Sequence, residues 1–195
     1  MKRSIVAYLL ALTITGSPVL GQTSEMPASA RLAMPGEKHT WLDPLVGEWT
    51  VEMLVYPEAG AEPITSKDLR ASRRKILDGR YIYEELRGVF AGNPSARDGI
   101  LGYNNLEGRF ELVTVDTFEP GQMVYAGRGD ETPNKFSMLG ESTEAGLGSE
   151  PSGRKRELRF EFEILDPDRN VQRIFAKFPG ESEFLFVEQR FTRAQ

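Results

Sequence analysis

Apolar and polar residues alternate with a period of two along much of the chain after residue 47. The segment "RELRFEFEIL" (156–165) gives the clearest example. Successive side chains of a strand point to opposite faces, so this period is typical of a strand with one buried face. The apolar positions, predicted to face inward, are Leu158, Phe160, Phe162 and Ile164. The charged positions, predicted to face water, are Glu157, Arg159, Glu161 and Glu163.

Prolines and Gly-containing turns divide the alternating segments from one another. After residue 50, prolines fall at positions 57, 63, 94, 120, 133, 151, 167 and 179. Proline cannot donate to a strand ladder, so these positions are predicted to mark turns. Ten strands are predicted near residues 48–57, 64–77, 80–89, 98–104, 109–118, 122–129, 135–142, 155–166, 170–178 and 182–193. Because closure removes aggregation-prone open edges, we expect an all-β fold: a closed up-and-down antiparallel barrel of about ten strands.

The segment "HTWLDPLVGEW" (39–49) precedes the first strand and contains both tryptophans of the chain. Pro44 prevents a long helix, so only a short helical turn fits before the strand. We predict that this turn plugs one end of the barrel and that a large aromatic residue lies beneath it. The residues expected to have this structural role are Leu42, Leu45, Gly47 and Trp49.

His39 is the only histidine of the chain. It could ligate a metal or haem, or it could cap a turn or bond to a backbone carbonyl. One His without a second His or any Cys is a poor ligand set. The structural role is therefore favoured, and no metal site is predicted.

Composition bounds the possible partners and the location of the protein. Lys2 and Arg3 precede an uncharged, mostly apolar run, and small residues lead to Gly21, a pattern typical of a cleaved signal peptide at 1–21. We expect a periplasmic or secreted protein; an uncleaved anchor is the less favoured alternative.

Without Lys2 and Arg3 the formal net charge changes from −5 to −7, which argues against nucleic acid and anionic lipid as partners. The Ala-, Ser- and Pro-rich residues 22–37 predict a flexible linker, and 38–195 a single domain.

A short helix followed by Gly-x-Trp resembles the calycin barrels, which include lipocalins, fatty-acid-binding proteins and nitrobindins. Four segments in order make a more specific pattern: "HTWLDPLVGEW", "LDGRYIYEE", "DGILGYNNLEGRFELVTVD" and "FVEQRFTR". Over residues 38–193 they resemble the bacterial family called domain of unknown function 1579. The resemblance implies a lipocalin-like barrel and no settled activity.

The chain departs from these relatives in two places. Thr114 and Val115 precede Asp116 where members of the family often carry Trp. Nitrobindins ligate haem through a histidine late in the chain, and this chain has none there. No cofactor is therefore expected.

The candidate functional residues lie on four predicted strands. If Glu85 and Asp116 both face inward, they could bind a polar head group, or act with Tyr83 in acid–base chemistry. The alternative is that one or both carboxylates are solvated, or pair with Arg87 or Arg128. This alternative is favoured. Arg70, Arg73, Arg74 and Lys75 are expected to form a solvated face, and Glu188 and Arg193 to pair at the C-terminus. The predicted ligand-binding residues are Met53, Tyr81, Tyr83, Glu85, Thr114, Asp116, Phe160 and Phe162.

Three functions fit this sequence. The favoured one is an exported binding protein that holds a small hydrophobic or amphipathic molecule in its cavity. The alternative is a barrel enzyme, of isomerase, hydratase or cyclase type, acting on such a ligand. The third is a barrel filled by side chains that presents its surface to a partner. Because Glu85 and Asp116 are anionic, a neutral or cationic ligand head is expected, unless an arginine such as Arg128 points inward.

Overall fold

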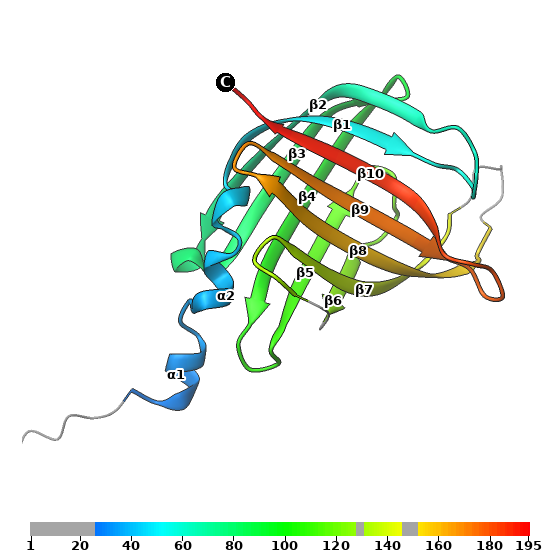
Figure 1. The fold of residues 1–195 in the computed structure, drawn as a ribbon. Helices are drawn as coiled ribbons and strands as arrows, with labels where there is room; N and C mark the ends of the chain where they lie inside the picture. The colour runs from blue at the N-terminus through cyan, green and yellow to red at the C-terminus, as the bar shows by residue number, and fades with distance from the viewer. Residues whose placement is uncertain (1–25, 128–130, 146–151) are drawn as a thin grey trace, which may run out of the picture.

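The computed structural model describes residues 26–127, 131–145 and 152–195, and these form one closed antiparallel barrel (Figure 1). Each strand pairs with its neighbours in the chain, and the first strand pairs with the last. The all-β, ten-stranded up-and-down barrel is thus confirmed. The strands are β1 (Gly47–Val55), β2 (Ile64–Ile76), β3 (Tyr81–Phe90), β4 (Asn93–Asn104), β5 (Arg109–Asp116), β6 (Met123–Gly127), β7 (Lys135–Thr143), β8 (Lys155–Asp166), β9 (Arg169–Lys177) and β10 (Phe184–Arg193).

The largest difference from the predicted strands is at β4, which begins five residues before the expected 98. Pro94 was expected to mark a turn, but it lies at the second position of β4 and pairs with Val89. Proline is tolerated at the beginning of a strand, where few ladder bonds are lost. The turn itself is Ala91–Gly92, and both residues have positive φ, as in the tight two-residue turns of hairpins.

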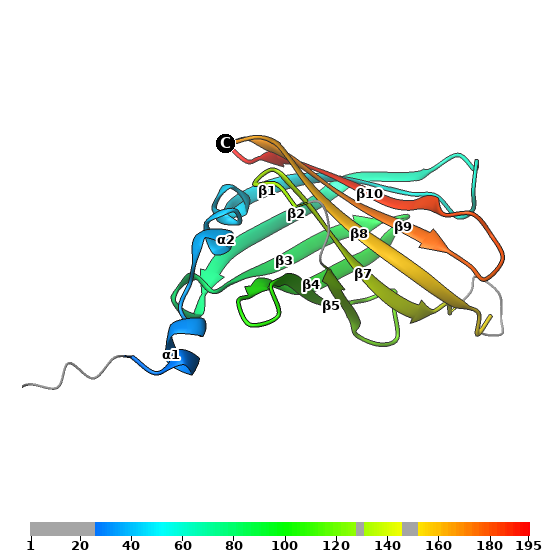
Figure 2. The same ribbon diagram turned by 60° about the horizontal axis from the view of Figure 1, so that its bottom comes forward.

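From residue 26 onward, three short helical segments precede the barrel: α1 (Ala28–Leu32), α2 (Glu37–Thr40) and the 3₁₀ turn η1 (Asp43–Leu45). Helix α1 lies within the predicted linker and has no buried residue. Figures 1 and 2 place α2 at the end of the barrel where β1 begins. The plug expected from the sequence is therefore present. The predicted signal peptide, 1–21, lies outside the described residues.

None of the helices in the described part of the chain is long and apolar enough to cross a membrane.

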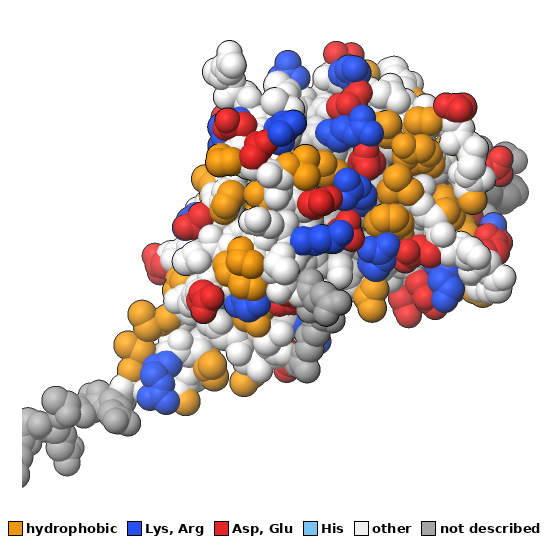
Figure 3. Space-filling view, viewed as in Figure 1, with side chains coloured by type: hydrophobic (Ala, Val, Ile, Leu, Met, Phe, Trp, Pro, Cys, Tyr) orange, Lys and Arg blue, Asp and Glu red, His pale blue; other side chains and the backbone are white. Residues whose placement is uncertain are grey.

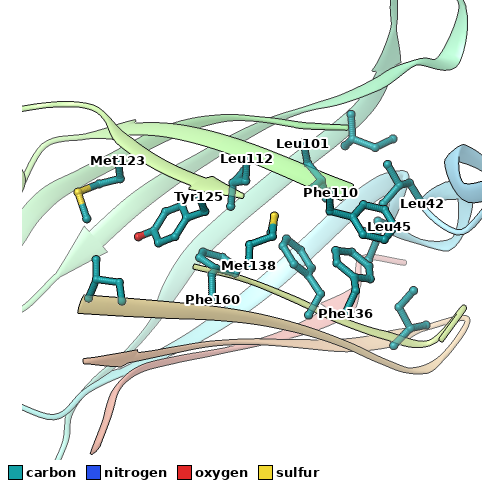
Figure 4. Packing of buried hydrophobic residues seen from close by; sticks show 14 of the residues in the cluster. Leu42, Leu45, Leu101, Phe110, Leu112, Met123, Tyr125, Phe136, Met138 and Phe160 are labelled. Atoms are coloured by element: carbon teal, nitrogen blue, oxygen red, sulfur yellow. The ribbon is translucent and has the colours of Figure 1, made fainter. Parts of the chain in front are cut away.

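Side chains fill the half of the barrel next to the plug. Phe136 stacks on Phe110 with 4.1 Å between ring centroids, and on Phe162 with 5.0 Å. Leu42 and Leu45 of the plug join this cluster (Figure 4). The predicted inward face of β8 is confirmed, because all its members are buried: Leu158, Phe160, Phe162 and Ile164.

Trp49 forms the predicted seal. Its side chain is buried, its indole N–H donates a 3.0 Å hydrogen bond to the carbonyl of Leu45, and its ring packs edge-on against Phe191. Gly47 has a φ of 132°, and a Cβ there would lie 2.5 Å from Nη1 of Arg193. Glycine is favoured at this position by the positive φ, and the guanidinium of Arg193 lies beside it.

Arg193 ties the C-terminal strand to the plug, but not through the predicted pair with Glu188. It donates to the carbonyls of Pro44, Val46 and Pro167. Glu188 instead accepts hydrogen bonds from Arg173 and Arg190. The sequence prediction of that pair was wrong because residues five positions apart on one strand point to opposite faces of the sheet.

The outer face of β8–β10 carries paired charges. Arg173 is hydrogen bonded to Glu161, Glu163 and Glu188 on the two neighbouring strands. Figure 3 shows basic and acidic side chains side by side on this face. Glu161 lies on the outer face as predicted, but its charged neighbours cover it and leave it only 9% exposed.

Candidate ligand-binding site

A cavity of about 320 Å³ occupies the half of the barrel away from the plug. Its mouth lies among the loops and strand ends around Pro57, Phe90, Phe118 and Ala145. The barrel is therefore filled at one end and hollow at the other. Most of the cavity wall is apolar, and its inner part is formed by Met53, Leu86, Met123, Leu158, Phe160 and Ile174.

A cluster of buried charges separates the cavity from the filled half. Glu84 on β3 accepts a hydrogen bond from Arg73 Nε through Oε2 and one from Arg97 Nη2 through Oε1, both at 2.6 Å. Two amides from β9 complete the cluster: Asn170 accepts from Arg73 at 3.0 Å, and Gln172 from Arg97 at 3.1 Å. One carboxylate thus serves two guanidinium groups inside the barrel.

The Glu84 carboxylate is ionised at neutral pH. Burial by itself raises the pKa of Glu84, but the charges and hydrogen bonds of Arg97 and Arg73 outweigh burial and hold the pKa at about 2. A carboxyl group with so low a pKa is a weak base and is not available as a general acid. Glu84 therefore stabilises the two arginines rather than moving protons.

Arg97 connects the charged cluster to the cavity. It lines the cavity and also a small void of about 20 Å³ beside Arg73, Glu84 and Gln172. Thr114 and Phe160 line both spaces as well. The inner end of the cavity is thus polar and basic, whereas its wall is apolar.

A second polar group lies nearer the mouth. Arg156 is buried, pairs with Glu119, and donates a 2.7 Å hydrogen bond to the hydroxyl of Ser142. The hydroxyl of Tyr125 lies within the electrostatic reach of both Arg97 and Arg156, and burial raises its pKa. It therefore stays protonated and can donate a hydrogen bond.

The structure brings four of the predicted ligand-binding residues into the cavity wall: Met53, Thr114, Asp116 and Phe160. Phe162 lies deeper, packed between Phe136 and Phe160, where it lines only the small void. Asp116 uses its carboxylate Oδ1 to accept hydrogen bonds from the backbone N–H groups of Phe118 and Glu119, so it orders the loop at the mouth.

The other predicted ligand-binding residues lie outside the barrel, because β3 has the opposite face inward. Tyr81, Tyr83 and Glu85 alternate with the buried face of β3, which is Ile82, Glu84 and Leu86. Glu85 lies within 3.4 Å of Arg87, which confirms one of the alternative interpretations. Arg128 lies outside the described residues. The candidate catalytic residues Tyr83, Glu85 and Asp116 therefore do not converge.

Sequence reasoning missed the charged cluster, although the signal for Arg73 was present. Arg73 was expected to be solvated with Arg70, Arg74 and Lys75, yet it is 3% exposed while the other three are exposed. It lies in phase with Leu69 and Ala71, and a period of two places all three on the inner face of β2. The alternation along β2 places Arg73 inside the barrel. Its buried charge is tolerated because Glu84 lies there as its partner.

His39 has the structural role that the sequence favoured. It is buried, and Nδ1 accepts a 2.9 Å hydrogen bond from the backbone N–H of Gly36 at the start of α2. Burial lowers the pKa of its imidazole, and hydrogen bonds with the backbone of Gly36 and Tyr103 partly oppose this. No group of three or more potential His, Cys, Asp or Glu ligands occurs among residues 26–127, 131–145 and 152–195.

The fold and cavity define a closed up-and-down β-barrel with a partly hollow interior. The profile of the family "Protein of unknown function (DUF1579)" matches residues 34–193, so the chain belongs to this family. The sequence-based expectation of this family is confirmed. No curated protein matches the chain in sequence.

The solved structures that match this chain include the following two. The crystal structure of Rv2717c from M. tuberculosis superposes with a TM-score of 0.58 and 16% identity, covering 83% of this chain and 100% of that chain. The S-type phycobiliprotein lyase CPES from Guillardia theta gives a TM-score of 0.45 and 9% identity, over 87% of this chain and 99% of that chain. The likeness to Rv2717c supports the barrel fold alone.

Proposed function

We propose that this protein is an exported binding protein that holds a small, largely apolar molecule in the open half of its barrel. The observation that carries the proposal is the cavity of about 320 Å³, lined by side chains such as Met53, Leu158 and Phe160. Ligand pockets of proteins have volumes from about 300 Å³ upward and are lined mostly by apolar groups with a few polar ones.

The apolar wall can supply useful affinity. Micromolar binding corresponds to about −8 kcal/mol. At about 25 cal/mol per Å², this requires roughly 320 Å² of buried apolar ligand surface before ordering costs. A chain of about ten carbons has that much surface, so a medium-length aliphatic or a compact ring system is the size of ligand we expect.

Binding is favoured over catalysis by the state of the carboxylates. Glu84 is held ionised between Arg73 and Arg97, and Asp116 is bonded to its own loop. Glu119, which also lines the cavity, is paired with Arg156. General acid–base chemistry needs a carboxyl whose pKa lies near the working pH, and the pKa of Glu84 is held well below it, at about 2.

Export is supported by the basic, then apolar, then small-residue order of positions 1–21. Mass spectrometry of the protein purified from its own source should give a chain that begins at Gln22. A chain that retains Met1 to Gly21 would contradict cleavage.

Native mass spectrometry of the same preparation tests binding directly, because a retained ligand adds mass. As a second test, a fluorescent lipophilic probe should bind saturably with micromolar affinity. Ile174→Trp should lower the affinity for the probe by at least about tenfold. Ile174 lines the cavity, and the larger indole ring would occupy the space that the probe needs.

The matched control for Ile174→Trp is Val124→Trp. Val124 lies on the outer face of β6, where it is 55% exposed, so this substitution should leave the affinity unchanged. The absence of saturable probe binding by the wild-type protein would contradict the proposed function, and would favour a partner-binding surface.

A further inference from the structure

We propose that the cavity selects ligands with an anionic head, a carboxylate above all, and that Arg97 and Thr114 hold this head at the inner end. The inference rests on the proposed binding function and names the ligand class of that same site. It reverses the preference for neutral or cationic heads expected from the sequence, because the inward arginine that would change this preference is present.

The first observation is a charge imbalance. The cluster at the floor of the cavity contains two guanidinium groups, Arg73 and Arg97, and one carboxylate, Glu84. Both oxygens of Glu84 are already used, one for each arginine. The cluster thus has a net charge of one positive unit in an interior where arginine side chains are 1% and 10% exposed. A buried unbalanced charge is costly, and a ligand anion would remove this cost.

The second observation is an excess of hydrogen-bond donors. Three buried donor nitrogens around the cluster have no hydrogen-bond partner in the described parts of the chain: Arg73 Nη2, Arg97 Nε and Asn170 Nδ2. Arg97 makes both of its hydrogen bonds through Nη2, so its Nη1 also has no partner among the described residues. Buried donors are nearly always paired in folded proteins. An incoming acceptor with two oxygens is what the arginine fork matches best.

The third observation is the position of the unused groups. Arg97 and Thr114 line both the cavity and the small void beside the cluster. No hydrogen bond involves the hydroxyl of Thr114 within the described chain, so this hydroxyl can donate to a head group. The Tyr125 hydroxyl lies within the electrostatic reach of both Arg97 and Arg156 and is a further donor along the cavity wall.

Acidic side chains near the mouth do not cancel this preference. Asp116 is paired with Arg97 in the strand register, but no ion pair joins them, and Oδ1 of Asp116 accepts two backbone hydrogen bonds in its own loop. Glu119 is neutralised by Arg156, and Glu144 accepts from the hydroxyl of Ser152. The head therefore lies at the floor, and the apolar chain extends past Phe160 toward the mouth.

The experiment titrates decanoate, decanol and decylamine against the displaced lipophilic probe at neutral pH. These ligands share one chain length and differ in head charge. Decanoate should bind at least about tenfold more tightly than decanol, a difference of about 1.4 kcal/mol, and decylamine should bind most weakly. Arg97→Gln should weaken the binding of decanoate at least about tenfold more than it weakens the binding of decanol. The variant should still fold, because Glu84 keeps Arg73 as its partner.

Arg87→Gln is the matched control, because Arg87 is on the outer face of β3 and pairs with Asp98 there. It should change none of the three affinities. Thr114→Val removes only the hydroxyl and should reduce the preference for decanoate by severalfold, which keeps the test decisive if Arg97→Gln does not fold. Saturable binding of decanol equal to or tighter than decanoate would overturn the anionic head and leave the binding function standing. Saturable binding of no ligand would overturn both.

Discussion

Glu84 and Arg97 meet inside the barrel, where Oε1 of Glu84 accepts a 2.6 Å hydrogen bond from Nη2 of Arg97. The two residues lie on adjacent strands, and both are less than 10% exposed. A buried pair of this kind contributes little compared with well-packed apolar residues, but removing one partner is costly. Its position between the filled and hollow halves therefore makes it a sensitive point of the fold.

Glu84→Gln should lower the free energy of unfolding by about 3–5 kcal/mol, because Arg73 and Arg97 would lose the one carboxylate partner that they have among the described residues. Urea denaturation followed by tryptophan fluorescence measures this change. Glu85→Gln is the control one residue away, because the side chain of Glu85 is on the outer face. This substitution should change the free energy of unfolding by no more than about 0.5 kcal/mol. Equal effects of the two substitutions would contradict the inward orientation of Glu84.

Stability should fall in acid over a window that Glu84 defines. Its pKa is about 2 in the folded protein and 4.5 ordinarily, so its contribution is complete above about pH 4.5 and is lost as the pH falls toward 2. Glu84→Gln should flatten the curve of unfolding free energy over this window. His39, whose pKa burial lowers from 6.5, adds a separate loss of stability as the pH falls below 6.5. An unchanged acid slope in Glu84→Gln would contradict the lowered pKa.

Trp49→Ala should lower the free energy of unfolding by about 3–5 kcal/mol, the range for large core aromatics. The reason is that Trp49 is 1% exposed and packs on Phe191. His39→Ala should cost far less, about 1 kcal/mol, because the loss is mainly that of the bond to Gly36 at the start of α2. Urea melts compare the two variants. A loss below about 1 kcal/mol for Trp49→Ala would refute the seal, and metal content that depends on His39 would refute its structural role.

Gly127→Ala should destabilise the barrel by about 1–3 kcal/mol, because the new methyl group would collide with the backbone of Ser137 and Met138 on β7. Among the described residues, β6 and β7 are paired through Tyr125 with Gly140 and Ala126 with Leu139, so close backbone approach at Gly127 falls beside this pairing. Gly121→Ala is the control: nothing lies within 4 Å of its Cβ position. The midpoint of thermal unfolding should be lower for Gly127→Ala than for Gly121→Ala. Similar midpoints would show that β6 and β7 can move apart without loss of stability.

The sequence predicted the number, order and approximate limits of the strands, because turn residues and a two-residue period are local signals. The inward face of β8 was predictable for the same reason: its apolar set, from Leu158 to Ile164, alternates with charges without interruption. The plug was predictable as well. Trp49 is in phase with Val51 and Met53, and Pro44 limits the helical turn before it.

Only the tertiary structure decided the inner face of β3 and the polarity of the cavity. Both faces of β3 combine apolar and charged residues, so local pattern could not choose between Glu84 and Glu85. The choice depends on partners: Arg73 comes from β2, Arg97 from β4, and the amides of Asn170 and Gln172 from β9. A buried charge is stable only where such partners converge, and their convergence is a property of barrel closure that no single segment encodes.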